Sequence, residues 1–100
     1  MKINELLNGI ECEKINFNEE IDINSVTVKD YECKNGSAFF CLNSNSIQLD
    51  KYVQNAIKLG ASVIISEKIV NNCTVAQVVV NDAREALTIF CKKFYKNPQK

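Results

Sequence analysis

Histidine is absent from this sequence of 100 residues, and so are two familiar nucleotide-binding motifs. Without histidine, the commonest general base near neutral pH is missing, and nucleophile pairs of the Ser/His or Cys/His kind are excluded. The three glycines form neither a G-x-x-x-x-G-K-[ST] phosphate loop nor a G-x-G-x-x-G fingerprint. We therefore assign no catalytic residue to this chain.

A net charge is also lacking, since 12 basic residues balance 12 acidic ones. No basic field exists to attract nucleic acid or an anionic membrane surface. No segment approaches the roughly 20 apolar residues of a membrane span, and the N-terminus has no apolar signal-peptide core. We expect a cytoplasmic protein whose partners include neither nucleic acid nor a membrane.

The five cysteines form no C-x-x-C pair, and there is no histidine to complete a zinc site with them. An odd number of cysteines at wide spacings is typical of free thiols in a reducing compartment. We predict buried or half-buried free thiols and no metal site. A composition of 46% hydrophobic and 24% charged residues is ordinary for one folded domain spanning residues 1–100.

Short apolar segments bounded by turn residues predict the strands. Asn4 can cap a short first helix, and alternating residues over 12–17 indicate a strand after it. A further short strand is expected at 26–28. Nearly continuous apolar segments, which fit strands buried on both faces of a parallel sheet, occupy residues 37–42, 61–66 and 76–80.

Two longer helices are expected between and after these strands. Asp50 can cap a helix over 51–59 that ends at Gly60. Asp82 begins a capping box with Glu85, in which each side chain bonds the other residue's amide and a helix follows. Strand, helix and strand within about thirty residues make a βαβ unit. The sequence therefore predicts an α/β fold: a three-layer-like single domain with a mostly parallel sheet flanked by helices.

One candidate site follows from this fold. Ligands of open α/β sheets bind outside the carboxyl ends of strands, and the polar loop 43–46 follows the strand at 37–42. Its amides and side chains offer donors and acceptors for a phosphate or a uracil edge. The alternative is that Asn and Ser serve there simply as loop-forming residues. Tyr31, Tyr52 and Tyr95 could contact a substrate, but Tyr52 and Tyr95 are expected to pack in the core.

Several segments, taken together, carry a recognisable pattern. They are Leu6-Leu7 in the opening helix, Val26-Thr27-Val28, KNGSAFF at 34–40, DKYVQNA at 50–56, GASVII at 60–65, QVVVNDAREAL at 77–87 and FYKNP at 94–98. In order and spacing they resemble the N-terminal domain of the Mur ligases. The likeness is greatest to the tripeptide synthetase, which adds diaminopimelate or lysine, and it covers nearly the whole chain.

This resemblance implies a function. Such ligases use ATP and magnesium to join an amino acid to a UDP-N-acetylmuramoyl-peptide in peptidoglycan biosynthesis. Their N-terminal domain holds the UDP end of that substrate. ATP and magnesium are expected only for the central domain, whose phosphate loop this sequence lacks, so no cofactor is expected here. The implied partners are the UDP-N-acetylmuramoyl-peptide and the rest of a Mur ligase.

The resemblance also implies two segments that contact uridine. The family's Thr-x-Asp-Ser-Arg segment falls on residues 27–31, where Asp30 stands in place of the serine and Tyr31 in place of the arginine. The family's polar loop falls on 44–47. A carboxylate at Asp30 would repel a diphosphate that it faced. The expected UDP-binding residues are Thr27, Val28, Asp30, Ser44, Asn45, Ser46 and Ile47.

Two other functions stay open at this point. The chain could be a degenerate stand-alone binding or interaction module that keeps the fold and has lost the nucleotide. It could also be a small α/β regulatory domain whose likeness to Mur ligases is coincidental. Titration with a UDP-N-acetylmuramoyl-dipeptide separates the first alternative from a UDP-binding domain, and a different strand order would favour the second.

Overall fold

The computed structural model describes residues 1–42 and 46–96, with the backbone alone at residues 46 and 47. Its sheet has five strands in the order β1-β5-β4-β3-β2. Neighbours among β2 to β5 pair in parallel, and β1 is antiparallel to β5. The strands are β1 (Cys12–Ile15), β2 (Ser25–Thr27), β3 (Ser37–Phe40), β4 (Val63–Ser66) and β5 (Ala76–Val80).

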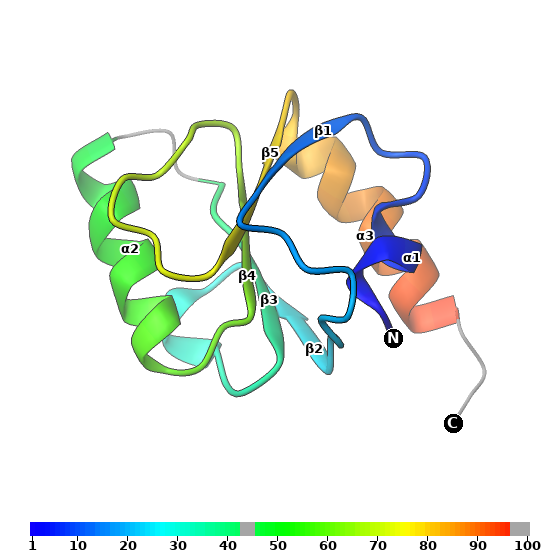
Figure 1. The fold of residues 1–100 in the computed structure, drawn as a ribbon, viewed down its shortest axis with the longest axis horizontal. Helices are drawn as coiled ribbons and strands as arrows, with labels where there is room; N and C mark the ends of the chain where they lie inside the picture. The colour runs from blue at the N-terminus through cyan, green and yellow to red at the C-terminus, as the bar shows by residue number, and fades with distance from the viewer. Residues whose placement is uncertain (43–45, 97–100) are drawn as a thin grey trace.

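Helices cover both faces of this sheet. They are α1 (Ile3–Leu7), α2 (Ser46–Lys58) and α3 (Ala83–Lys96), and a short 3-10 turn, η1 (Asp30–Glu32), lies between β2 and β3. Figure 1 shows the sheet nearly edge-on, with α2 on its left and α1 and α3 on its right. The predicted α/β domain with a mostly parallel sheet between helices is confirmed.

Alternating side chains of the central strands divide the core into two clusters. Phe40 and Ile65 pack on the side of α1 and α3, whereas Phe39 and Ile64 pack on the side of α2. Phe40 meets Phe90 of α3 edge to face, with ring centroids 5.0 Å apart. Every residue of β3 and β4 is buried. Because helices or loops cover both faces, these strands are apolar throughout instead of alternating with polar residues.

Two helix starts differ from the prediction. Lys2 precedes α1 without a side-chain cap, and Asn4 lies inside that helix. The second helix begins at Ser46, so Asp50 lies within it and does not cap it. Asn and Asp favour caps but are also tolerated at exposed positions within a helix. A cap-forming residue in the sequence therefore marks only one of several possible helix starts.

The end of α2 is as predicted. Gly60 has a φ of +113° and follows the last turn of the helix. Its amide donates to the carbonyl of Ile57, and the amide of Ala61 donates to the carbonyl of Ala56. Such bonds satisfy carbonyls that the helix end leaves without a partner, and the left-handed backbone that they need suits glycine.

The start of α3 is capped by two carboxylates. Oδ1 of Asp82 accepts from the amide of Glu85 at 3.1 Å, as predicted. The bond from Glu85 back to Asp82 is not among the hydrogen bonds of the described residues. Instead, Oε2 of Glu67, which follows β4, accepts from the amide of Ala83 at 2.8 Å. Two negative groups thus sit at the positive end of the helix dipole.

The thiols follow the prediction, and one tyrosine does not. All five cysteines are free; Cys33 and Cys41 are buried and the other three are half-buried. Tyr95 is 68% exposed, so the expectation that it packs in the core is wrong. Phe90 and Phe94 lie four residues apart on the buried face of α3, and Tyr95 lies one position beyond that face.

Candidate functional site

A pocket opens where β2 and β3 end at the same edge of the sheet. The two strands run parallel, with Thr27 opposite Phe39, so the residues that follow them lie next to each other. The volume of the pocket is about 310 Å³. Its lining consists of Val28, Lys29, Asp30 and Tyr31 from the segment between β2 and η1, Phe39, Cys41 and Leu42 from β3 and the residues after it, and Tyr52 from α2.

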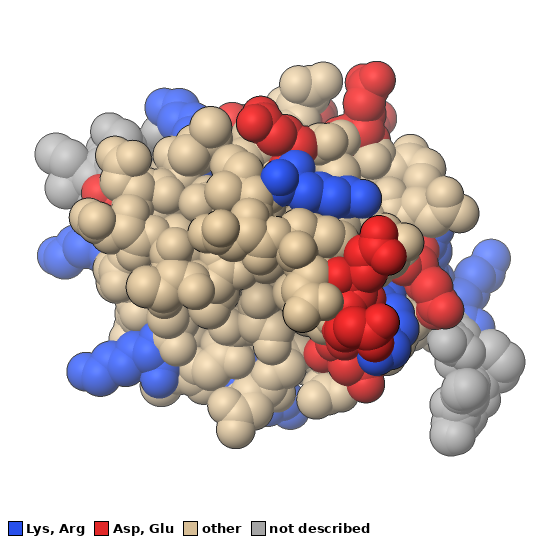
Figure 2. All heavy atoms as spheres, viewed as in Figure 1, with Lys and Arg blue, Asp and Glu red and all other residues tan. Residues whose placement is uncertain are grey.

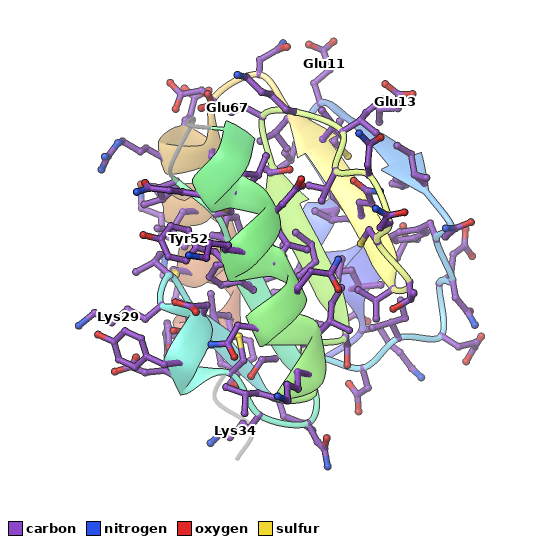
Figure 3. The ribbon with its side chains drawn as sticks, turned by 90° about the vertical axis from the view of Figure 1, so that its left-hand side faces the viewer. Glu11, Glu13, Lys29, Lys34, Tyr52 and Glu67 are labelled. Carbon is purple, nitrogen blue, oxygen red and sulfur yellow. The ribbon has the colours of Figure 1, made fainter. Side chains whose placement is uncertain are left out.

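The pocket has an apolar floor and a more polar rim. Phe39 and Cys41 are 2% and 4% exposed and form part of the floor. Tyr31, at the rim, is 65% exposed. Figure 3 shows Tyr52 of α2 and Lys29 projecting on the same side of that helix. An apolar hollow with a few polar groups at its edge is typical of small-molecule sites.

The two charged groups of the pocket come from neighbouring residues. Nζ of Lys29 lies 5.9 Å from the ring centroid of Tyr31, which is within the range of a cation–π contact. Oδ2 of Asp30 accepts from Nδ2 of Asn55 at 2.7 Å, and this bond ties η1 to α2. The pocket therefore carries a cation at its rim and a carboxylate held against the helix beside it.

Thr27 shapes the turn that leads into this lining. Its Oγ1 accepts from the amide of Lys29 at 3.1 Å, and it lies 3.3 Å from a carboxylate oxygen of Glu32, to which it can donate. These bonds connect the end of β2 to η1. Thr27 is not among the lining residues in the described part of the chain, so its hydroxyl acts on the shape of the segment.

Cys33, which follows η1, lies in a closed environment. Burial, and after it the negative charge of Asp30, raise the pKa of the Cys33 thiol from 9.0 to about 11. Its Sγ donates to the carbonyl of Lys29 at 3.9 Å. The thiol therefore stays protonated at neutral pH and serves as a small apolar side chain behind the pocket wall.

The predicted site residues differ in how far the structure describes them. Val28 and Asp30 line the pocket. Residues 46 and 47 begin α2, and only their backbone is described. Ser44 and Asn45 lie outside the described residues. The structure thus places the segment after β2 beside the end of β3, and the loop prediction at 44–47 stays untested.

Sequence reasoning missed part of the lining. Lys29 sits between two residues that were singled out, at the aspartate position of the family segment, where the residue type is not kept. Tyr52 was expected in the core; it is half-buried against the α2-side cluster and also faces the pocket. Starting α2 at Ser46 instead of after Asp50 would have placed Tyr52 on the second turn, close to the end of β3.

Other charged groups are spread over the surface. Figure 2 shows acidic side chains gathered on the right of the visible face, over the N-terminal segment and the loop between β1 and β2, with basic side chains among them. Glu11, Glu13 and Glu67 line a second hollow of about 250 Å³ (Figure 3).

Over residues 1–42 and 46–96, no three His, Cys, Asp or Glu residues are grouped to hold a metal ion. Among the helices of those ranges, none has the length and apolarity needed to cross a membrane.

Relatives of known function match almost the whole chain. It is 34% identical over 98% of its length to a UDP-N-acetylmuramoyl-L-alanyl-D-glutamate–2,6-diaminopimelate ligase of Alkaliphilus oremlandii. It is 30% identical over 99% and 98% of its length to ligases of the same name from Clostridium tetani and Listeria monocytogenes. The chain spans about a fifth of the length of these relatives. No family model matches it.

Solved structures share the fold. A UDP-N-acetylmuramoylalanyl-D-glutamyl-2,6-diaminopimelate–D-alanyl-D-alanyl ligase from Acinetobacter baumannii superposes with a TM-score of 0.74 at 20% identity. That match covers 93% of this chain and 22% of the ligase. A crystal structure of MurF from the same organism gives a TM-score of 0.75, again at 20% identity, over 93% of this chain and 21% of that one. At this identity the likeness establishes the fold alone.

Proposed function

From the homology of this chain to the Mur ligases, whose N-terminal domain it fits, we propose that it binds the UDP end of a UDP-N-acetylmuramoyl-peptide. In this role it is the substrate-binding domain of an ATP-dependent ligase of peptidoglycan-precursor synthesis in the cytoplasm. The proposed contacts are Val28 and Asp30 in the pocket, and Ser44, Asn45, Ser46 and Ile47 at the loop and helix start; Thr27 shapes the segment that carries the first two.

The observation that carries this proposal is the pocket at the ends of β2 and β3. The segment after β2, which the family resemblance implicates, lines this pocket together with the end of β3, the strand that leads into the second implicated segment. The pocket's volume of about 310 Å³ suits part of a nucleotide better than a whole nucleotide sugar. The apolar floor suits a uracil ring, and the rim cation Lys29 suits a phosphate.

The described residues do not fit ATP with magnesium. The chain has no phosphate loop, and no group of side chains in its described part is placed to hold a metal ion. We therefore derive no phosphoryl or acyl transfer step from this chain. Its contribution to such a reaction is to bind the nucleotide end of the substrate. This binding positions the reacting end of the substrate for the rest of the enzyme.

Filling the pocket tests the proposal. Val28 is 42% exposed at the pocket and Leu59 is 41% exposed at the end of α2, away from the lining. We expect Val28→Trp to weaken binding of UDP-N-acetylmuramoyl-dipeptide at least tenfold, roughly the 1–2 kcal/mol that one blocked contact commonly costs. Leu59→Trp is the matched control and should bind as the unchanged protein does. Titration calorimetry measures both.

A second function has specific support. The Asp30 carboxylate lies in the pocket, and the Thr27 hydroxyl is used within its own turn. Both features favour a stand-alone binding module that has kept the fold and lost the nucleotide. If the unchanged protein shows no heat of binding and no amide shifts at millimolar UDP-N-acetylmuramoyl-dipeptide, the binding proposal is wrong and this alternative stands.

A further inference from the structure

The two charged side chains of the pocket, Asp30 and Lys29, lie on different sides of it. Asp30 lies on the side where η1 meets α2, because Asn55 of α2 holds its carboxylate at 2.7 Å. Lys29 lies on the outer side, over the exposed ring of Tyr31. Figure 3 shows the Lys29 side chain extending away from the body of the domain. Negative charge therefore marks the inner wall of the pocket, and positive charge marks its rim.

The bond to Asn55 also fixes how Asp30 can meet a ligand. An amide N–H of Asn55 occupies Oδ2, and the other carboxylate oxygen keeps its capacity to accept. A carboxylate accepts hydrogen bonds from hydroxyl or N–H groups and repels phosphate oxygens. A nucleoside offers the first kind of group, in its ribose hydroxyls, and a diphosphate offers the second.

Resting on the proposed function, we infer that Asp30 is a specificity-determining residue that orients a uridine nucleotide. Its carboxylate, positioned by Asn55, accepts from the ribose hydroxyls at the inner wall. The diphosphate is thereby directed to the rim, where Lys29 neutralises part of its charge. Among the described residues of the site, the nucleoside is thus recognised through the Asp30 acceptor and the diphosphate through the Lys29 cation.

The test compares uridine with UDP, each followed by amide chemical shifts. In Asp30→Asn, the side-chain oxygen can still accept from Asn55, but the group left facing the ligand is then an N–H donor. Uridine affinity should fall about tenfold, the usual value of one hydrogen bond to a charged group. UDP affinity should fall less or rise, because the repulsion of phosphate is removed.

The exchange variant Asp30→Asn with Asn55→Asp is the matched control. It keeps the net charge and the hydrogen bond between η1 and α2, with donor and acceptor reversed. Residue 30 then donates to residue 55 and presents its own oxygen to the pocket, so most of the lost uridine affinity should return. If Asp30 had only a structural role, uridine affinity would not differ between the two variants, since both keep the hydrogen bond between residues 30 and 55. Far-ultraviolet circular dichroism checks that both are folded.

The outcomes of these titrations distinguish the inference from the proposed function. Loss of uridine affinity in the single variant with recovery in the exchange variant supports the inference. Equal changes for uridine and UDP, or no change in either, overturn the inference, and the proposed function stands as long as the unchanged protein binds UDP. If the unchanged protein binds neither uridine, UDP nor UDP-N-acetylmuramoyl-dipeptide, the proposed function fails and the inference fails with it.

Discussion

Gln77 is a polar side chain buried within the sheet, beside the connection between β4 and β5. It lies in β5 and is only 3% exposed. Its Oε1 accepts from the amide of Val70 at 2.8 Å, and its Nε2 donates to the carbonyl of Val70 at 3.0 Å. The side chain thus pairs with the connection between β4 and β5 in the way a neighbouring strand would.

Replacing this amide should unfold the protein at lower denaturant. In Gln77→Leu, both backbone groups of Val70 lose their partner in a buried place, so we expect the free energy of unfolding to fall by about 2 kcal/mol or more. Gln54→Ala is the control, because Gln54 bonds the carbonyl of Asn72 in the same connection from an exposed position. Its cost should stay under about 1 kcal/mol. Equal midpoints in urea for the two variants would contradict this account.

Cys33 should be the thiol that resists alkylation. At pH 9.0, its ordinary pKa, the folded protein keeps this thiol largely protonated because its pKa is about 11. Folded protein treated with iodoacetamide should be modified at half-buried Cys12 well before Cys33, and unfolding in urea should remove the difference. Peptide mass spectrometry measures both rates. Modification of Cys33 as fast as Cys12 in the folded state would show that the wall behind the pocket is open.

The same raised pKa affects stability in alkaline solution. Unfolded Cys33 begins to lose its proton near pH 9.0, whereas the folded thiol keeps its proton until about pH 11. The stability that the neutral thiol contributes is therefore complete below pH 9.0 and is lost as the pH rises through this window. Stability falls as the pH rises because burial disfavours the charged form of this acid in the folded protein.

The pocket residues that could be predicted from the sequence are those that belong to a local sequence pattern. Val28 and Asp30 follow a short strand and fall on a family segment, so they were named. Tyr52 was given to the core because helical spacing puts it on the apolar face, and that spacing cannot show that the face also borders a hollow. The pairing of Asp30 with Asn55 joins residues 25 positions apart, which no local pattern encodes.

At the scale of elements, strands were predicted better than helix starts. The segments at 37–42, 61–66 and 76–80 contain β3, β4 and β5 because burial on both faces leaves a continuous apolar signal. The strand expected over 12–17 ends at Ile15, since Asn16 has a φ of +53° and turns the chain. Helix starts depend on which of several cap-forming residues the tertiary structure uses.

Two aspartates were both predicted to cap a helix, and in the structure only Asp82 does so. Asp82→Ala removes the acceptor for the amide of Glu85 at the start of α3, so it should lower the free energy of unfolding by about 1 kcal/mol. Asp50→Ala changes an exposed residue inside α2, where alanine is the better helix former, and should be neutral or slightly stabilising. Urea denaturation of both variants gives the comparison. A larger cost at Asp50 would mean that α2 starts where the sequence alone suggested.

At the scale of the whole molecule, the strand order decides where the site lies. The order β1-β5-β4-β3-β2 puts β2 beside β3, so the segments that follow them share an edge. Neither apolar periodicity nor composition gives this order, because it depends on pairings between distant residues. The sequence predicts a mostly parallel sheet, which is confirmed, but no strand order; that order comes from the structure. The antiparallel pairing of β1 with β5 at the far edge was not predicted.

The most direct test of the account is an amide shift map of the protein with UDP-N-acetylmuramoyl-dipeptide added. A ligand in the pocket should move the amides of Val28, Asp30 and Leu42, together with those at 44–47, and leave those at 11–13 unmoved. Shifts confined to the acidic hollow at 11–13 and Glu67, or no shifts at millimolar ligand, would contradict the assignment of this pocket to the nucleotide.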